Sequence, residues 1–151
     1  MGAEPFRPLV PVLVGPTAVG KTAVALALAD RLAITVICAD ARQVYQRLDI
    51  GTAKPDRETR AHVPHEGLDL VEPGERYSAG RFARDAAEWL TEARAARRQP
   101  LVVGGTGFYV RALADGLFHE PPLDPERRER LHVWAAGIPG PIGPHTLRHC
   151  F

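Results

Sequence analysis

The sequence is poor in cysteine, in net charge and in paired metal ligands, and each shortage excludes a class of protein. Its two cysteines, Cys38 and Cys150, are too few for a disulfide framework. Cys38 lies in an apolar run, where a buried and inert thiol is expected. The six histidines have no Cys or His partners at zinc spacing, so no structural zinc site is predicted. The formal net charge of +1 does not by itself predict nucleic-acid binding.

Long apolar stretches are also missing. No run approaches the roughly 20 residues that span a bilayer, so a transmembrane protein is excluded. Residues 1–6 lack a basic segment followed by an apolar one, and Phe6 replaces the Ser or Thr of a myristoylation signal. We therefore expect a cytoplasmic protein, and no feature of the sequence indicates a membrane or protein partner, so a monomer is expected.

The 151 residues are enough for one ordinary globular domain. Apolar runs at 9–14, 34–39 and 100–105 predict strands, the first of them buried, and helical patterns cover 21–31, 78–98 and 106–117. This alternation predicts an α/β domain with a parallel sheet. Residues 42–74 contain Pro55, Pro64 and Pro73, and predict mostly loops. We place the core domain at 1–136, with a charged helix beginning near Glu126, and expect 137–151, rich in Gly and Pro, to be irregular or disordered.

The strongest motif is a P-loop between the first predicted strand and the first predicted helix. It matches G-x-x-x-x-G-K-[ST] and consists of Gly15, Pro16, Thr17, Ala18, Val19, Gly20, Lys21 and Thr22. The glycines let backbone N–H groups point inward, the helix adds its positive end, and Lys21 adds a cation. Thr22 can place its hydroxyl on Mg²⁺. The motif predicts a phosphate site, and leaves open whether the ligand is ATP, GTP or another diphosphate.

The position of the nearest carboxylate helps to interpret this site. An ordinary P-loop NTPase has a strand that ends in an Asp near magnesium, but the strand at 100–105 ends in Gly104-Gly105-Thr106. The carboxylate occurs instead at Asp40, just beyond the strand at 34–39, on the sheet edge where ligands collect in open α/β folds. From its position alone, Asp40 could equally be a turn or cap residue.

Three further motifs connect the chain to a known family. They are Asp40-Ala41-Arg42-Gln43-Val44-Tyr45, Asp49-Ile50-Gly51-Thr52-Ala53-Lys54-Pro55 and Leu101-Val102-Val103-Gly104-Gly105-Thr106-Gly107-Phe108-Tyr109. With the Gly-Pro-Thr-Ala form of the P-loop, they closely resemble the ordered motifs of tRNA dimethylallyltransferases, from about Val12 to Arg130. Ala41 stands where the family commonly has Ser, and the tail after His132 resembles nothing in the family.

The resemblance implies a P-loop NTPase-like parallel sheet flanked by helices, truncated relative to the family. It also implies transfer of a dimethylallyl group from dimethylallyl diphosphate to the N6 amine of an adenosine beside the tRNA anticodon. Lys21, Thr22 and Mg²⁺ would stabilise the departing pyrophosphate, Asp40 would receive the proton, and Thr106 would assist. The target base would be flipped from its stack. The residues implied to contact tRNA are Asp40, Ala41, Arg42, Gln43, Thr106 and Arg128, although a solvated helix charge also explains Arg128.

Three alternatives stay open at this point. A small-molecule P-loop kinase would explain the P-loop and the chain length without tRNA. A related transferase could act on free adenine nucleotides. A truncated and catalytically idle domain could bind diphosphate without enclosing tRNA, because family chains continue well past this point and residues 137–151 read like translation in a shifted frame.

Overall fold

A computed structural model of the chain describes residues 9–116 and, after them, residues 126, 127, 130, 133 and 134. The chain divides after Gly116 into two units, and the first contains every element named below. In the second unit the described residues are helical, at and after the predicted helix start near Glu126. Arg128, the boundary predicted at 136 and the segment 137–151 lie outside the described residues.

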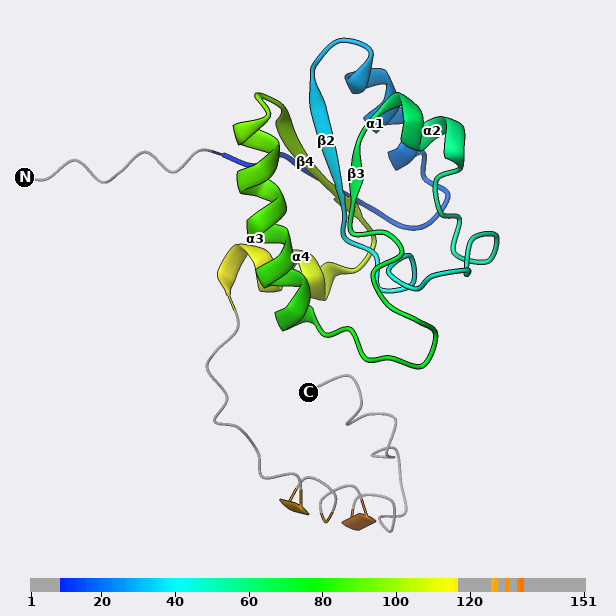
Figure 1. The fold of residues 1–151 in the computed structure, drawn as a ribbon, viewed down its shortest axis with the longest axis vertical. Coiled ribbons are helices and arrows are strands. Elements are labelled where there is room, and N and C mark those ends of the chain that lie inside the picture. Colours follow the sequence, from blue (N-terminus) through cyan, green and yellow to red (C-terminus); the bar gives the residue numbers. More distant parts are fainter. Residues whose placement is uncertain (1–8, 117–125, 128–129, 131–132, 135–151) are drawn as a thin grey trace, which may run out of the picture. The chain divides into compact units, whose positions relative to one another are not determined.

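The first unit is built on a four-stranded sheet in which every pair of neighbours is parallel (Figure 1). The strands are β1 (Val12–Val14), β2 (Ile34–Cys38), β3 (His65–Glu66) and β4 (Gln99–Gly104), in the order β1-β4-β2-β3. The longest register joins β2 to β4, from Ile34 opposite Gln99 to Cys38 opposite Val103. A parallel sheet with flanking helices confirms the predicted fold class.

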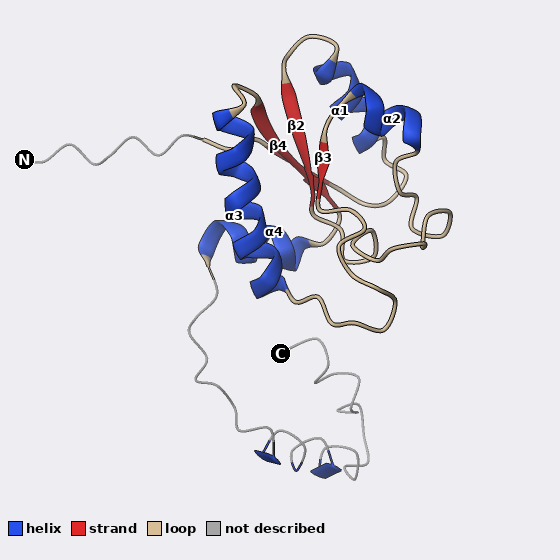
Figure 2. Ribbon diagram, in the orientation of Figure 1, coloured by secondary structure: helices blue, strands red, loops and turns tan. Residues whose placement is uncertain are grey.

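Helices cover both faces of this sheet (Figure 2). They are α1 (Lys21–Ala29), α2 (Arg57–His62), α3 (Ala79–Ala95) and α4 (Gly107–Asp115). Successive residues of a strand point to opposite faces. Accordingly, Val36 and Cys38 join a cluster with Ala25 of α1, whereas Ile37 joins a second cluster with residues of α3 and α4.

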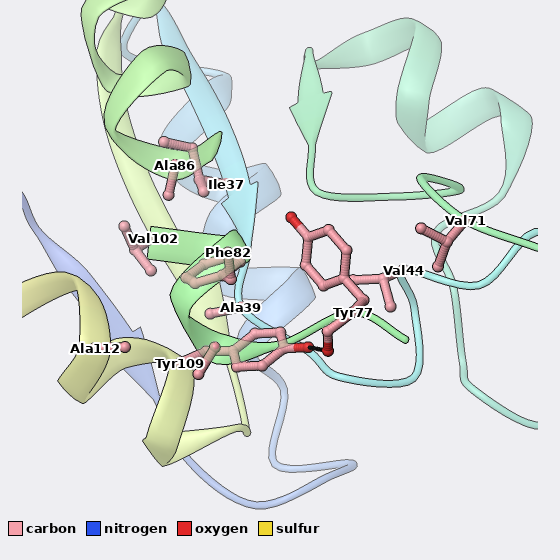
Figure 3. Close-up of a cluster of buried hydrophobic side chains, with 11 residues drawn as sticks. Ile37, Ala39, Val44, Val71, Tyr77, Phe82, Ala86, Val102, Tyr109 and Ala112 are labelled. Carbon is pink, nitrogen blue, oxygen red and sulfur yellow. Dashed lines mark hydrogen bonds between the residues drawn. The ribbon is translucent and has the colours of Figure 1, made fainter. Parts of the chain in front are cut away.

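Aromatic rings form much of the core between the sheet, α3 and α4 (Figure 3). Phe82 of α3 stacks on Tyr109 of α4, with ring centroids 4.6 Å apart and an interplanar angle of 16°. The Tyr109 hydroxyl donates a hydrogen bond of 3.1 Å to the carbonyl oxygen of Tyr77, at the segment that leads into α3. This core therefore fixes α4, and with it the β4–α4 turn, against the sheet.

The predicted elements outside 42–74 are present with slightly different ends. Within 42–74, the prediction of mostly loops missed α2 and β3. Helix α2 is capped by Asp56, whose carboxylate accepts the N–H of Thr59 at 2.8 Å. Strand β3 has only two residues, too few for a pattern. No described helix is long and apolar enough to cross a membrane.

The prediction that the first strand is buried is wrong. Val12 is 46% exposed and Val14 is 57% exposed. Strand β1 lies at the edge of the sheet and, within the part of the chain that the structure describes, pairs only with β4. An apolar run predicts a strand, but the run alone does not distinguish a central strand from an edge strand.

Candidate functional site

The P-loop curls between β1 and α1 as its sequence predicts. Gly20 precedes α1 with a φ of 94°, a left-handed conformation that favours glycine. Lys21 begins the helix, and its Nζ donates hydrogen bonds to the carbonyl oxygens of Gly15 (2.8 Å) and Pro16 (2.7 Å). An ammonium has three protons, so one remains for a ligand while the loop's own carbonyls hold the side chain.

A cavity of about 290 Å³ adjoins the P-loop at the carboxyl ends of β2 and β4. Its lining comes from the P-loop, from the segments after β2 and around residue 53, and from residues of α1, β2, β3 and β4. The lining residues are Thr17, Ala18, Gly20, Lys21, Thr22, Ala25, Leu26, Val36, Cys38, Asp40, Arg42, Gln43, Thr52, Ala53, Pro55, His65, Val103 and Gly104. Ligands of open α/β sheets bind at this edge.

The structure therefore brings most of the predicted site residues to one cavity. Lys21, Thr22, Asp40, Arg42 and Gln43 all line it. Among the residues that the structure describes, the predicted ones that do not line it are Gly15, Pro16, Val19, Ala41 and Thr106. Gly15 and Pro16 still contribute, since their carbonyl oxygens hold Lys21.

Thr106 acts on the turn that carries Asp40. Its Oγ1 accepts the backbone N–H of Ala41 at 2.9 Å, and its own N–H donates to the carbonyl oxygen of Ala39 at 3.1 Å. Oδ1 of Asp40 accepts the N–H of Arg42 at 2.9 Å. These bonds orient the Asp40 carboxylate and leave its second oxygen for a ligand.

Gly104 marks a very close approach of two chain segments at the same edge. A Cβ at this position would lie 2.1 Å from the backbone oxygen of Ala39, so only glycine fits here without displacing the backbone. The end of β4 can therefore lie directly against the residue that precedes Asp40.

Gln43 connects the cavity to a neighbouring loop. Its Nε2 donates to the carbonyl oxygens of Thr52 (3.0 Å) and Ala53 (3.1 Å), two residues that also line the cavity. Both amide protons are used, so Oε1 is the atom that Gln43 can offer to a ligand.

Two further lining residues are held in uncharged states by burial. Cys38 is only 4% exposed, which confirms the expected burial of this thiol, and burial raises its pKa to about 12. Burial lowers the pKa of His65 below its ordinary range. Nδ1 of His65 lies 2.7 Å from the carbonyl oxygen of Val63; a carbonyl only accepts, so Nδ1 carries the proton. Sequence patterns missed His65 as a lining residue because β3 was not predicted.

The oxygen ligands at the cavity suit magnesium only together with a substrate. Thr22 and Asp40 can supply a hydroxyl and a carboxylate, the hard ligands that Mg²⁺ prefers. Across the described residues, no group of three or more His, Cys, Asp or Glu side chains could hold a metal ion. Magnesium at this site would therefore take most of its ligands from a bound diphosphate and from water.

Comparison with known proteins gives a consistent set of relatives. A model of the IPP transferase family matches residues 43–138, and a model of isopentenyl transferase matches residues 8–65. The tRNA dimethylallyltransferase of Anaeromyxobacter dehalogenans is 53% identical over 125 residues, which are 83% of this chain and 42% of the relative. The tRNA dimethylallyltransferase of Desulfotalea psychrophila is 49% identical over 128 residues, which are 85% of this chain and 41% of the relative.

A solved structure shows the same arrangement. The full-length tRNA isopentenylpyrophosphate transferase of Bacillus halodurans superimposes with a TM-score of 0.71 at 38% identity, over 86% of this chain and 43% of that one. The chain thus spans less than half the length of the relatives it matches.

Proposed function

Because the chain belongs to the IPP transferase family, we propose that it transfers a dimethylallyl group from dimethylallyl diphosphate to the N6 amine of an adenosine beside the tRNA anticodon. One observation carries the proposal: Lys21 and Thr22 of the P-loop line the same cavity as Asp40. A diphosphate site and a carboxylate that can accept a proton are the two parts this transfer needs. We place the activity in the cytoplasm, with tRNA and dimethylallyl diphosphate as partners of a monomer.

In the proposed reaction the bond between C1 of the dimethylallyl group and the diphosphate oxygen breaks, and a bond between N6 and C1 forms. The diphosphate leaves with the electron pair. The backbone N–H groups of the P-loop and the ammonium of Lys21 stabilise the negative charge that develops on the diphosphate. Magnesium bound beside Thr22 would neutralise part of that charge.

Asp40 accepts the proton that N6 loses. An aromatic amine is a poor nucleophile, so removal of its proton as the new bond forms lowers the barrier. The Arg42 N–H fixes one oxygen of Asp40, and the Thr106 hydroxyl fixes the adjoining turn. We therefore assign Thr106 and Ala41 to the support of Asp40. From the family resemblance alone, we assign Arg42, Gln43 and Arg128 to contacts with tRNA.

The end of β4 favours this reaction over that of an ordinary kinase. After β4 the chain continues with Gly105 and Thr106, and no Asp stands there to hold magnesium for ATP chemistry. The absence of this Asp is the feature that separates the two reactions, because a carboxylate after β2 could accept a proton from either kind of acceptor.

The test is incubation of the purified chain with magnesium, labelled dimethylallyl diphosphate and unmodified tRNA. We expect label on tRNA, at least about 100-fold less with Asp40→Asn, and no change with Asp115→Asn, a carboxylate 68% exposed on α4. Labelling that survives Asp40→Asn would remove Asp40 from the mechanism. Phosphorylation of a small substrate by ATP, without any response to dimethylallyl diphosphate, would favour a kinase instead. Competition by AMP rather than by tRNA would indicate a free-nucleotide acceptor.

A further inference from the structure

Lys54 is a completely buried cation beside the cavity. Its side chain is 0% exposed, whereas Ala53 and Pro55 on either side of it line the cavity. Its Nζ donates to the carbonyl oxygen of Tyr45 at 2.6 Å and to Oδ1 of Asp69 at 2.7 Å, and it pairs with Oδ1 of Asp49 at 3.0 Å. These two hydrogen bonds, the ion pair with Asp49 and the complete burial of the side chain keep Lys54 away from a ligand phosphate in the cavity.

A second cation extends this contact to the other side of the loop. Arg60 of α2 pairs with Oδ2 of Asp69 at 2.7 Å, and its Nε donates to the carbonyl oxygen of Pro55 at 2.9 Å. Burial favours the neutral form of Asp69, but the hydrogen bonds from Lys54 and Arg60 outweigh it and lower the pKa of this carboxyl. Asp69 therefore remains ionised at neutral pH and joins the two cations.

The loop held in this way has an uncommon backbone conformation. Ala53 has a φ of 52° and Asp69 a φ of 54°, in the left-handed region that residues with a Cβ rarely occupy. Such conformations persist only where surrounding contacts impose them. Lys54 follows Ala53 directly in the chain and its ammonium pairs with Asp69, so this one residue links the two positions.

The same loop determines where Gln43 lies. The carbonyl oxygens of Thr52 and Ala53 receive both protons of the Gln43 side-chain amide. A shift of the loop would therefore move Gln43 and the neighbouring wall of the cavity. The P-loop is held separately, through the bonds of Lys21 to Gly15 and Pro16.

We propose that Lys54 is a positioning residue for the acceptor. Its buried ammonium holds the loop 49–55 so that Gln43, Thr52 and Ala53 form the wall that receives the adenosine, while the P-loop binds diphosphate independently. The identity of the acceptor rests on the proposed function; the role of Lys54 in shaping the wall does not.

The first experiment compares two lysine variants by hydrogen exchange and by calorimetric titration with magnesium pyrophosphate. The amides of Ala53 and Lys54 donate to the carbonyl oxygens of Ile50 and Asp49, both at 3.1 Å, and so report on loop order. In Lys54→Met, residues 46–54 should exchange at least about tenfold faster, with pyrophosphate affinity unchanged within about twofold. Lys21→Met should show the reverse, and Lys54→Arg should recover part of the protection. Unchanged exchange in Lys54→Met would overturn the proposal.

A second variant separates a local effect from loss of the fold. Asp69→Asn keeps the size of the side chain and removes its charge. Faster exchange at 46–54 with β2 and β4 still protected, in this variant and in Lys54→Met, supports the proposal. Loss of protection in β2 and β4 in both variants would make Lys54 a residue of general stability and overturn it.

Kinetics supply a measurement that a merely structural role would not produce. With tRNA as the acceptor, Lys54→Met should raise KM for tRNA by at least about tenfold and leave KM for dimethylallyl diphosphate unchanged, with partial recovery in Lys54→Arg. An equal rise in both KM values would overturn the proposal. If the unaltered chain labels no tRNA, the proposed function fails for this chain, while the exchange and pyrophosphate results still decide the role of Lys54.

Discussion

At the scale of single residues, Gly104 limits what the carboxyl edge of the sheet can tolerate. Gly104→Ala would place a Cβ 2.1 Å from the Ala39 oxygen, and relief requires a backbone shift at both strand ends. We expect Gly104→Ala to lower the free energy of unfolding by about 3 kcal/mol or more and to weaken pyrophosphate binding. Urea denaturation and calorimetry measure these effects.

Gly107→Ala is the matched control for that change. Gly107 begins α4, and a Cβ there would have no atom within 4 Å apart from its chain neighbours and the backbone of its own helix. Alanine is the better helix former, so the variant should be as stable as the original chain or more stable by up to about 1 kcal/mol. Equal behaviour of the two variants would show that the close contact at Gly104 does not limit the fold.

His65 predicts a pH dependence of stability. Burial lowers the pKa of the folded state, whereas the unfolded chain has the ordinary value near 6.5. As pH falls below about 6.5, the His65 side chain of the unfolded chain is protonated before that of the folded chain. The free energy of unfolding therefore decreases over this range, and the decrease ends once pH is below the pKa of the folded state. Thermal unfolding between about pH 7 and pH 5 should show this loss, and His65→Asn should reduce it.

His62→Asn is the control for His65. The side chain of His62 is 51% exposed and lies 2.9 Å from Asp30, so His62 does not share the burial of His65. The loss of stability on acidification should persist in this variant. The same slope in His65→Asn and in the unaltered chain would mean that another group causes the pH dependence.

At the scale of elements, the start of α3 depends on one hydroxyl. Ser78 Oγ accepts the N–H of Arg81 at 3.1 Å, satisfying a donor that the helix leaves free. Ser78→Ala should cost about 1 kcal/mol in urea denaturation. Thr91→Ala removes a hydroxyl from the same helix, where it bonds the carbonyl oxygen of Ala87, and should cost little. Similar losses in both variants would contradict a capping role for Ser78.

The elements that sequence patterns predicted are those with a clear apolar signal. Helix α3 has apolar residues that recur at helical spacing, and the central strands β2 and β4 lie in continuous apolar runs. Strand β3 is too short for such a signal, and the prolines near α2 concealed a capped helix. The burial of β1 was predicted wrongly because position within a sheet depends on which strands pair, and a single run contains no information on pairing.

The site divides in a similar way. The P-loop is contiguous, so its residues and their purpose can be predicted from spacing alone. The support of Ala41 by Thr106 joins residues 65 positions apart, and the burial of Lys54 depends on Asp69, 15 positions away. The sequence around Lys54 does not indicate burial, and only the packed structure shows that this side chain is enclosed.

At the scale of the whole molecule, the lining residues that the structure describes all lie within the part that the family models cover. Its lining residues run from Thr17 to Gly104, and the two models together match residues 8–138. More than half of each relative nevertheless lies outside the match, since this sequence spans 41% and 42% of two of them. Binding of diphosphate should therefore need only the matched part of the chain, whereas full turnover of tRNA should need the longer chain of the relatives.

Truncation of a relative tests this separation. The Anaeromyxobacter dehalogenans protein, cut to the 42% that matches this chain, should bind magnesium pyrophosphate within about threefold of its full-length form, because a P-loop binds through its own backbone and lysine. Its labelling of tRNA should fall by at least about tenfold, because contacts remote from the reacting atoms supply binding energy for the transition state. Calorimetry and the labelling assay should give the same pattern for this chain. Loss of pyrophosphate binding on truncation would show instead that the diphosphate site needs residues beyond the matched part, and that the cavity is only half of that site.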